Sequence, residues 1–199
     1  RGPRDMALWK GETTSDTLRL NLDTYHYATD LLGGFVQEVQ AGPLAKTTLV
    51  AATGDHNVRT FGIYAESSRR YLMRQVPFVI WGDGLACGSQ LSLPASHRDM
   101  FPTLLPLAGV RGPYVNSGRN LLLPVAAQPD PLNAPRALFY TGELRNAQGM
   151  WQLGQQNSFV CSGAPVATPT PCSFNALDDQ QERARYALLD WNVRVSLRK

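Results

Sequence analysis

The sequence lacks the long apolar run that a membrane-spanning helix requires, since no stretch approaches about 18 consecutive apolar residues. It also has little clustered positive charge: the formal net charge is +3 over 199 residues, and no basic run is longer than Arg69-Arg70. Proteins that follow a phosphate backbone usually gather Lys and Arg on one face. We therefore expect no membrane segment within this chain and no nucleic-acid partner.

An initiator Met and a secretory signal are absent as well. The first residues, RGPRDMALWKGETTSD, are polar and contain no strand that could open a fold. We interpret the chain as a piece of a longer polypeptide, in which an export signal or a membrane anchor lies upstream.

Cysteine is scarce, with only Cys87, Cys161 and Cys172, and their spacing fits no zinc-binding pattern. The last two bracket the proline-rich segment SGAPVATPTP. A disulfide between them would stabilise the fold by about 2–3 kcal/mol by restricting the unfolded chain, and it would indicate an oxidising compartment. The alternative is three unrelated thiols. We predict a Cys161–Cys172 disulfide, with Cys87 free.

What the sequence does contain is typical of an ordinary folded protein, with 43% hydrophobic and 18% charged residues. Between Ser15 and Gly42, apolar residues recur at three- and four-residue intervals and predict a helix. Its Gly33-Gly34 pair suggests close packing against another element. The segments 47–52 and 75–82 then predict strands, and the continuous apolar run of the first favours a strand covered on both faces.

A short helix is predicted after residue 95, because Ser96 and Asp99 stand in capping-box relation and Gly109 can end it. Beyond the linker PVAAQPDPLNAP, the segments RALFYTGE, GMWQLGQ and NSFVCSG predict three antiparallel strands, followed by an amphipathic helix over 178–197. We predict an α/β fold: a sheet with flanking helices in residues 1–124, and a small β-rich subdomain in residues 125–199.

Asp55 and His56 directly follow the predicted strand 47–52, and Gly54 permits a sharp exit from it. In open α/β sheets, ligand sites gather beyond the carboxyl ends of the strands. A carboxylate beside an imidazole suits Zn²⁺ or Mn²⁺. The residues alone leave an alternative open, in which Asp55 caps a turn and His56 is merely exposed.

Four segments, in order, resemble the sulfatase-like branch of the alkaline phosphatase superfamily, and within it the lipoteichoic acid synthase and phosphoglycerol transferase group. They are YHYATDLLGGFVQEVQ, TTLVAATGDH, VPFVIWGDG and SHRDMFPTLLPLAGV, which contains the Asp-x-x-Pro-Thr motif of the family. The resemblance covers roughly residues 15–125.

This resemblance implies that Asp55 and His56 are metal ligands for Mn²⁺ or Zn²⁺, with Mg²⁺ or Ca²⁺ as alternatives. It makes Arg59 and His97 candidates for contacting an anionic substrate, against the alternative that both are simply exposed. The implied function is that of a phosphoglycerol or phosphoethanolamine transferase or phosphodiesterase. It would act on a lipid or glycan head group at the extracytoplasmic face of the bacterial inner membrane or in the periplasm. The alternatives are a sulfatase and a non-catalytic binding remnant.

One departure from the family pattern concerns the nucleophile. In the family, the nucleophilic Thr and an acidic ligand lie far upstream of the Asp-His pair, but only 54 residues precede Asp55 here. None of the four threonines among them has the strand-to-helix context that a nucleophile needs; they are Thr13, Thr14, Thr17 and Thr24. We therefore expect the nucleophile upstream of this chain, which would hold half of an active site.

Overall fold

The computed structural model of the chain describes residues 16–57, 75–86, 88–91, 93–114, 118–124, 136–139, 142–146, 149–161 and 173–196. The chain divides into two compact units. Unit 1 comprises Arg1–Gly62 and Gln75–Gly88, and unit 2 comprises Ile63–Arg74 and Ser89–Lys199. The domain boundary predicted at residue 124 stays a prediction.

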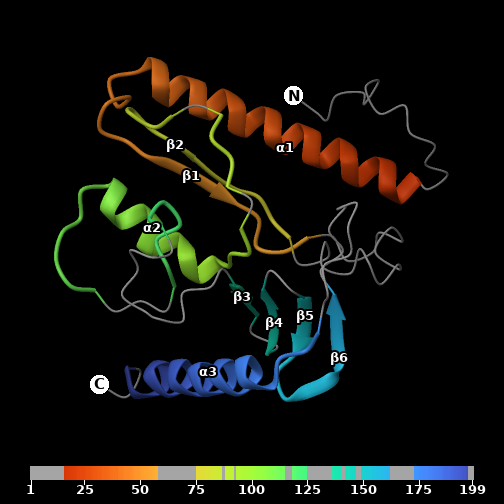
Figure 1. Cartoon of the computed structure of the whole chain (residues 1–199). Helices are drawn as coiled ribbons and strands as arrows, with labels where there is room; N and C mark the ends of the chain where they lie inside the picture. The colour runs from red at the N-terminus through yellow and green to blue at the C-terminus, as the bar shows by residue number, and fades with distance from the viewer. Residues whose placement is uncertain are drawn as a thin grey trace. The chain divides into compact units, whose positions relative to one another are not determined.

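Unit 1 contains one long helix and a two-stranded sheet (Figure 1). The helix α1 spans Asp16–Ala41, which confirms the helix predicted between Ser15 and Gly42. Strands β1 (Val50–Thr53) and β2 (Phe78–Trp81) confirm the two predicted strands. They pair antiparallel, with Val50 opposite Trp81 and Thr53 opposite Phe78.

Two expectations about unit 1 are wrong for the residues that the structure describes. Residues of β1 alternate between half-buried and exposed, so this strand is covered on one face only. The reason is that unit 1 has a single described helix, and one helix can cover only one face of a sheet. In addition, a Cβ added at Gly33 or Gly34 would meet no atom within 4 Å, so these glycines mark no close packing.

The first described helix of unit 2 is the predicted short helix. It consists of a 3₁₀ turn, η3 (His97–Asp99), followed by α2 (Met100–Leu107). Gly109 follows with a φ of 75°, in the left-handed region that glycine adopts without strain. The amide of Val110 donates to the carbonyl of Leu105 at 3.0 Å, which satisfies one of the free carbonyls at the helix end.

Four antiparallel strands follow in spatial order β3-β4-β5-β6 (Figure 1). Their bounds are Arg136–Leu138, Glu143–Asn146, Gly149–Gln152 and Gln155–Cys161. The sequence predicted three, because RALFYTGE reads as one strand. Instead that segment turns back: Gly142 has a φ of 78° and its amide donates to the carbonyl of Phe139 at 2.9 Å. The segment therefore supplies β3 and the start of β4.

The core of unit 2 lies on this sheet. Leu144 and Trp151 are buried, and the ring of Trp151 lies 5.8 Å from that of Phe159 and 6.0 Å from that of Phe174, centroid to centroid. Helix α3 (Ala176–Ser196) is joined to the sheet by a polar contact, since Trp151 Nε1 donates to Asp179 Oδ1 at 3.0 Å.

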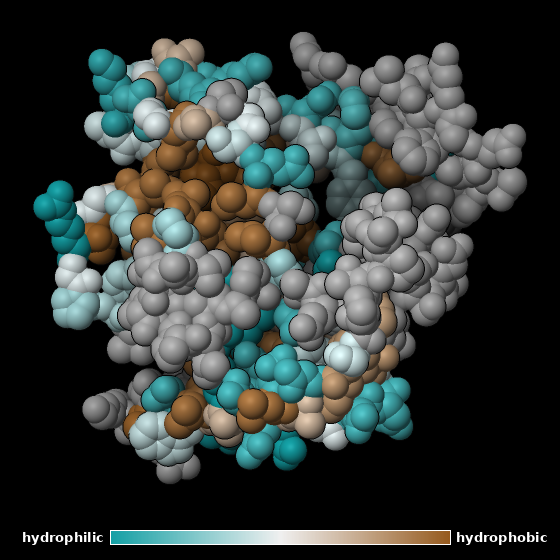
Figure 2. Space-filling view, viewed as in Figure 1, coloured by the Kyte–Doolittle hydropathy of each residue, from teal (hydrophilic) through white to brown (hydrophobic). Residues whose placement is uncertain are grey.

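The predicted C-terminal helix therefore exists. Unlike an ordinary amphipathic helix, it buries acidic side chains and exposes several large apolar ones. Asp179 and Glu182 are buried, whereas Leu177, Leu188 and Trp191 are each about 60% exposed. Figure 2 shows apolar side chains among polar ones where α3 lies. None of the helices in the described part of the chain is long and apolar enough to cross a membrane.

Gly118 provides a test of the packing in unit 2. A Cβ at this position would overlap the carbonyl group of Arg98 and lie 2.7 Å from the amide nitrogen of Asp99. These are backbone atoms that cannot move aside alone, so we expect Gly118→Ala to lower the free energy of unfolding by at least about 2 kcal/mol. Gly33→Ala is the matched control and should raise it by about 0.5–1 kcal/mol, because alanine favours the helix. Urea unfolding followed by tryptophan fluorescence measures both, and equal stability of the two variants would contradict this packing.

Cys161, the last residue of β6, is disulfide-bonded. Its predicted partner Cys172 and the predicted free thiol Cys87 both lie outside the described residues. Alkylation of the denatured, unreduced chain should therefore label one cysteine, at position 87. Peptide mass spectrometry identifies the labelled residue, and labelling of Cys172 would show that the pairing is wrong.

Candidate metal site and a buried polar cluster

The candidate metal ligands Asp55 and His56 leave the sheet directly after β1. The chain passes close to Val76 there, since a Cβ on Gly54 would lie 3.2 Å from Val76 Cγ1. This contact is tighter than ordinary van der Waals packing, which explains why glycine suits the position. The end of β1 and the glycine after it thus deliver both side chains to the surface.

Both side chains are exposed, the carboxylate by 87% and the imidazole by 62%. The carboxylate oxygen Asp55 Oδ1 accepts a hydrogen bond from the backbone amide of His56 at 2.8 Å. On the other side, His56 Nδ1 lies 3.1 Å from the carbonyl oxygen of Asn57. The remaining polar atoms, Asp55 Oδ2 and His56 Nε2, face each other at 3.4 Å.

This geometry fits part of a divalent metal site. Two donors that each lie about 2.1 Å from one ion, at a tetrahedral angle, are about 3.4 Å apart. Asp55 Oδ2 and His56 Nε2 have that separation, and their oxygen and nitrogen chemistry suits Mn²⁺ or Zn²⁺. The residues that the structure describes contain no group of three or more His, Cys, Asp or Glu able to hold a metal. The pair is thus a two-donor contribution to a site.

The structure does not test the other two candidate residues from the sequence. Arg59 lies outside the described residues. His97 is exposed at the first position of η3, in unit 2. A substrate-binding role for either residue stays a prediction.

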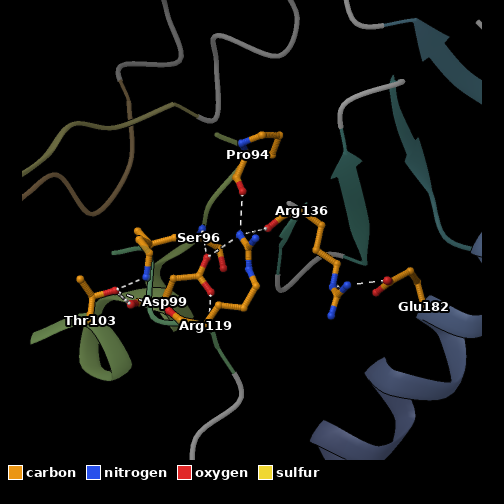
Figure 3. Close-up of polar contacts among 8 residues, drawn as sticks. Pro94, Ser96, Asp99, Thr103, Arg119, Arg136 and Glu182 are labelled. Atoms are coloured by element: carbon orange, nitrogen blue, oxygen red, sulfur yellow. Dashed lines mark hydrogen bonds and ion pairs between the residues drawn. The ribbon is translucent and has the colours of Figure 1, made fainter. Parts of the chain in front are cut away.

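Asp99 was predicted as a capping residue, but its burial and its contact with Arg119 were not (Figure 3). Among the described residues of unit 2, its carboxylate is the most buried acidic group, at 3% exposed. Its Oδ2 accepts from the amide of Ser96 at 2.9 Å, as the predicted capping box requires, and its Oδ1 accepts from the amide of Arg119 at 2.8 Å. The guanidinium of Arg119 lies 3.5 Å from Oδ2 and also donates to the carbonyl of Pro94 at 2.9 Å.

Thr103 holds the same neighbouring segment one helical turn later. Its hydroxyl donates to the carbonyl of Asp99 at 2.6 Å and accepts from the amide of Leu121 at 3.0 Å. Asp99 and Thr103 therefore both bind the chain at residues 119–121, which gives the Asp-x-x-Pro-Thr motif a structural role. Their four-residue spacing on one helix face was a usable signal in the sequence. The sequence contained no comparable signal for Arg119, because this residue lies 20 positions after Asp99.

Further polar contacts lead toward α3. The guanidinium of Arg119 lies 3.5 Å from the carbonyl oxygen of Arg136 in β3, and Arg136 Nε lies 3.3 Å from Glu182 Oε1 in α3 (Figure 3). Glu182 is 8% exposed, so its charge requires such a partner. Helix α2, the sheet and α3 are thus linked by buried polar contacts within unit 2.

Comparison with known proteins shows the family to which the chain belongs. The family model described as sulfatase matches residues 3–110, more than half of the chain, and the chain belongs to the sulfatase family. It is 35% identical to arylsulfatase K of Danio rerio over 127 residues, which are 56% of this chain and 23% of that protein. It is 27% identical to arylsulfatase K of Gallus gallus over 196 residues, 89% of this chain and 36% of that protein. No solved structure matches the chain.

These comparisons confirm the resemblance to the sulfatase-like branch and the α/β fold class of a partial domain of that kind. They do not confirm the narrower placement in the lipoteichoic acid synthase and phosphoglycerol transferase group. The chain spans 36% or less of the length of each of these relatives. The activity of the whole protein is therefore a matter for proposal.

Asp99 offers a test of the buried cluster. Asp99→Asn replaces one of the two accepting oxygens by a donor, so one backbone amide of the cluster loses its acceptor and the guanidinium of Arg119 loses its charge partner. We expect the free energy of unfolding to fall by about 3–5 kcal/mol. The control Asp190→Asn makes the same chemical change in an exposed pair with Arg194 and should cost about 0.5 kcal/mol. Urea unfolding compares the two, and similar losses would show that the cluster is not stabilising.

Proposed function

We propose that this chain is part of a metal-dependent sulfatase and contributes Asp55 and His56 as two of its metal ligands. The observation that supports the proposal best is the 3.4 Å separation of Asp55 Oδ2 and His56 Nε2, in a segment within the region matched by the sulfatase family model. The exposure of both side chains leaves these atoms accessible to an ion and to ligands from other parts of a larger protein.

A bound divalent ion would stabilise an ionised nucleophile and the negative charge that develops on the sulfuryl group. The residues of this chain contribute in two ways. Asp55 supplies a negatively charged oxygen, which favours a divalent cation over a neutral ligand. His56 supplies a nitrogen donor, which favours Mn²⁺ or Zn²⁺ over Mg²⁺ and Ca²⁺, the two alternatives.

The proposed substrate class is a sulfate ester, because the relatives that match this chain are named arylsulfatases. The transferase and phosphodiesterase activities expected from the sequence have no comparable support. The non-catalytic alternative is kept as an outcome of the test below. We also propose an extracytoplasmic location, which the disulfide at Cys161 supports because such bonds persist in oxidising compartments.

We further propose that the nucleophile belongs to a part of the protein outside this chain. The 199-residue chain alone should then bind Mn²⁺ or Zn²⁺ weakly and should not hydrolyse a chromogenic sulfate ester, because a two-donor site is incomplete. In the full-length protein, Asp55→Ala and His56→Ala should each abolish turnover while the thermal unfolding temperature stays within a few degrees. Calorimetric metal titration and the ester assay measure both effects.

The matched control is Glu38→Ala, which removes an exposed carboxylate from α1 in the same unit and should leave turnover unchanged. Robust hydrolysis by the 199-residue chain would contradict the proposed division of the active site. Undiminished activity of full-length His56→Ala would remove the pair from the metal site. A full-length protein that binds metal and glycans without turnover would favour the non-catalytic alternative.

A further inference from the structure

We infer that the backbone carbonyl of Asn57 is a positioning group, which holds His56 in the tautomer that carries hydrogen on Nδ1 and leaves Nε2 as the metal-facing nitrogen. The role of Nε2 toward an ion rests on the proposed function. The tautomer itself does not, so the two can be tested separately.

The direction of one hydrogen bond determines the tautomer of His56. His56 Nδ1 lies 3.1 Å from the carbonyl oxygen of Asn57. A carbonyl oxygen can only accept, so a hydrogen bond between these two atoms requires the hydrogen on Nδ1. In the neutral ring this leaves a lone pair on Nε2. An imidazole free in water has the opposite preference and carries its hydrogen mainly on Nε2, so the contact reverses the ordinary state.

The carboxylate of Asp55 is also held by a backbone group of the next residue. Asp55 Oδ1 accepts from the backbone amide of His56 at 2.8 Å, and Oδ2 is the oxygen that faces His56 Nε2. Each side chain is thus bound at one end by the backbone of its neighbour and directs its other end to a common point. Metal-ligating histidines commonly donate the N–H of their second ring nitrogen to a carbonyl oxygen in this way.

The two atoms that face each other, Asp55 Oδ2 and His56 Nε2, together favour an electron-poor partner. Asp55 Oδ2 and His56 Nε2, 3.4 Å apart, are both electron-rich when the ring is neutral and hydrogen is on Nδ1. They cannot bond to each other in that state, and their repulsion is relieved by a cation that both can coordinate. A protonated ring would instead direct its Nε2–H at the carboxylate as an ion pair. In the neutral ring with hydrogen on Nδ1, the arrangement therefore suits a cation.

The tautomer can be measured without any metal or activity. In the full chain with ¹⁵N-labelled histidine, long-range ¹H–¹⁵N spectra at alkaline pH distinguish a protonated Nδ1 from a protonated Nε2. Variants His26→Gln and His97→Gln assign the signals to the three rings. We expect His56 to carry hydrogen mainly on Nδ1 in the folded chain and mainly on Nε2 in the same chain in urea. A folded His56 that carries hydrogen mainly on Nε2 would overturn the inference.

The metal-facing nitrogen is tested in the full-length protein by Mn²⁺ binding, followed by electron paramagnetic resonance of the free ion. Glutamine can place an oxygen near the Nε2 position, whereas asparagine reaches only the Nδ1 position. We expect His56→Asn to lose at least about tenfold more affinity than His56→Gln. The reverse order would overturn the assignment of Nε2. If the tautomer is as inferred but both variants bind Mn²⁺ like the unsubstituted protein, the proposed function fails while the positioning by Asn57 is supported.

Discussion

The packing of unit 2 depends on the contacts of one buried carboxylate, that of Asp99. Both of its oxygens are used, because they accept from two backbone amides and face the guanidinium of Arg119. Arg119 in turn contacts the carbonyl oxygens of Pro94 and Arg136. Segments far apart in the sequence are therefore held by one charge pair. Its removal would leave several backbone groups buried without partners, which costs more than the loss of a surface ion pair.

Asp55 shows how the same residue type can serve a different purpose when it is less fully engaged. Its Oδ1 also accepts from a backbone amide, but Oδ2 faces only the imidazole of His56, and the side chain is 87% exposed. Three donors surround the two buried oxygens of Asp99, which stabilises the fold. Asp55 Oδ2 instead lies on an exposed side chain and faces His56 Nε2, so it can bind a ligand. The contrast explains why Asp99 is structural and why Asp55 is a candidate ligand within the same family domain.

The sequence predicted the local elements well wherever the signal was local. The long helix α1, the strands β1 and β2, and the capping box at Ser96 follow from periodicity and from residues three or four positions apart. Predictions that depended on partners elsewhere in the chain were less successful. The single strand expected in RALFYTGE turns back at Gly142, and α3 buries Asp179 while it exposes Leu188.

Some features of the candidate site were likewise predictable from the sequence, and others were not. The position of Asp55 and His56 after a strand was predictable from Gly54 and the apolar run before it. The hydrogen bond between His56 Nδ1 and the carbonyl of Asn57 was not, because any residue supplies a carbonyl and its direction depends on backbone conformation. The importance of Arg119 was hidden for a related reason, since its partner Asp99 is 20 residues away.

The central claim is that Asp55 Oδ2 and His56 Nε2 bind one divalent ion in the complete protein. Anomalous X-ray diffraction from crystals of the full-length protein, soaked in Mn²⁺ and recorded at the manganese edge, tests it most directly. We expect one strong peak about 2.1 Å from both atoms, with Nδ1 of His56 still directed at the carbonyl of Asn57. A manganese peak elsewhere, with Asp55 and His56 free of metal, would contradict the account.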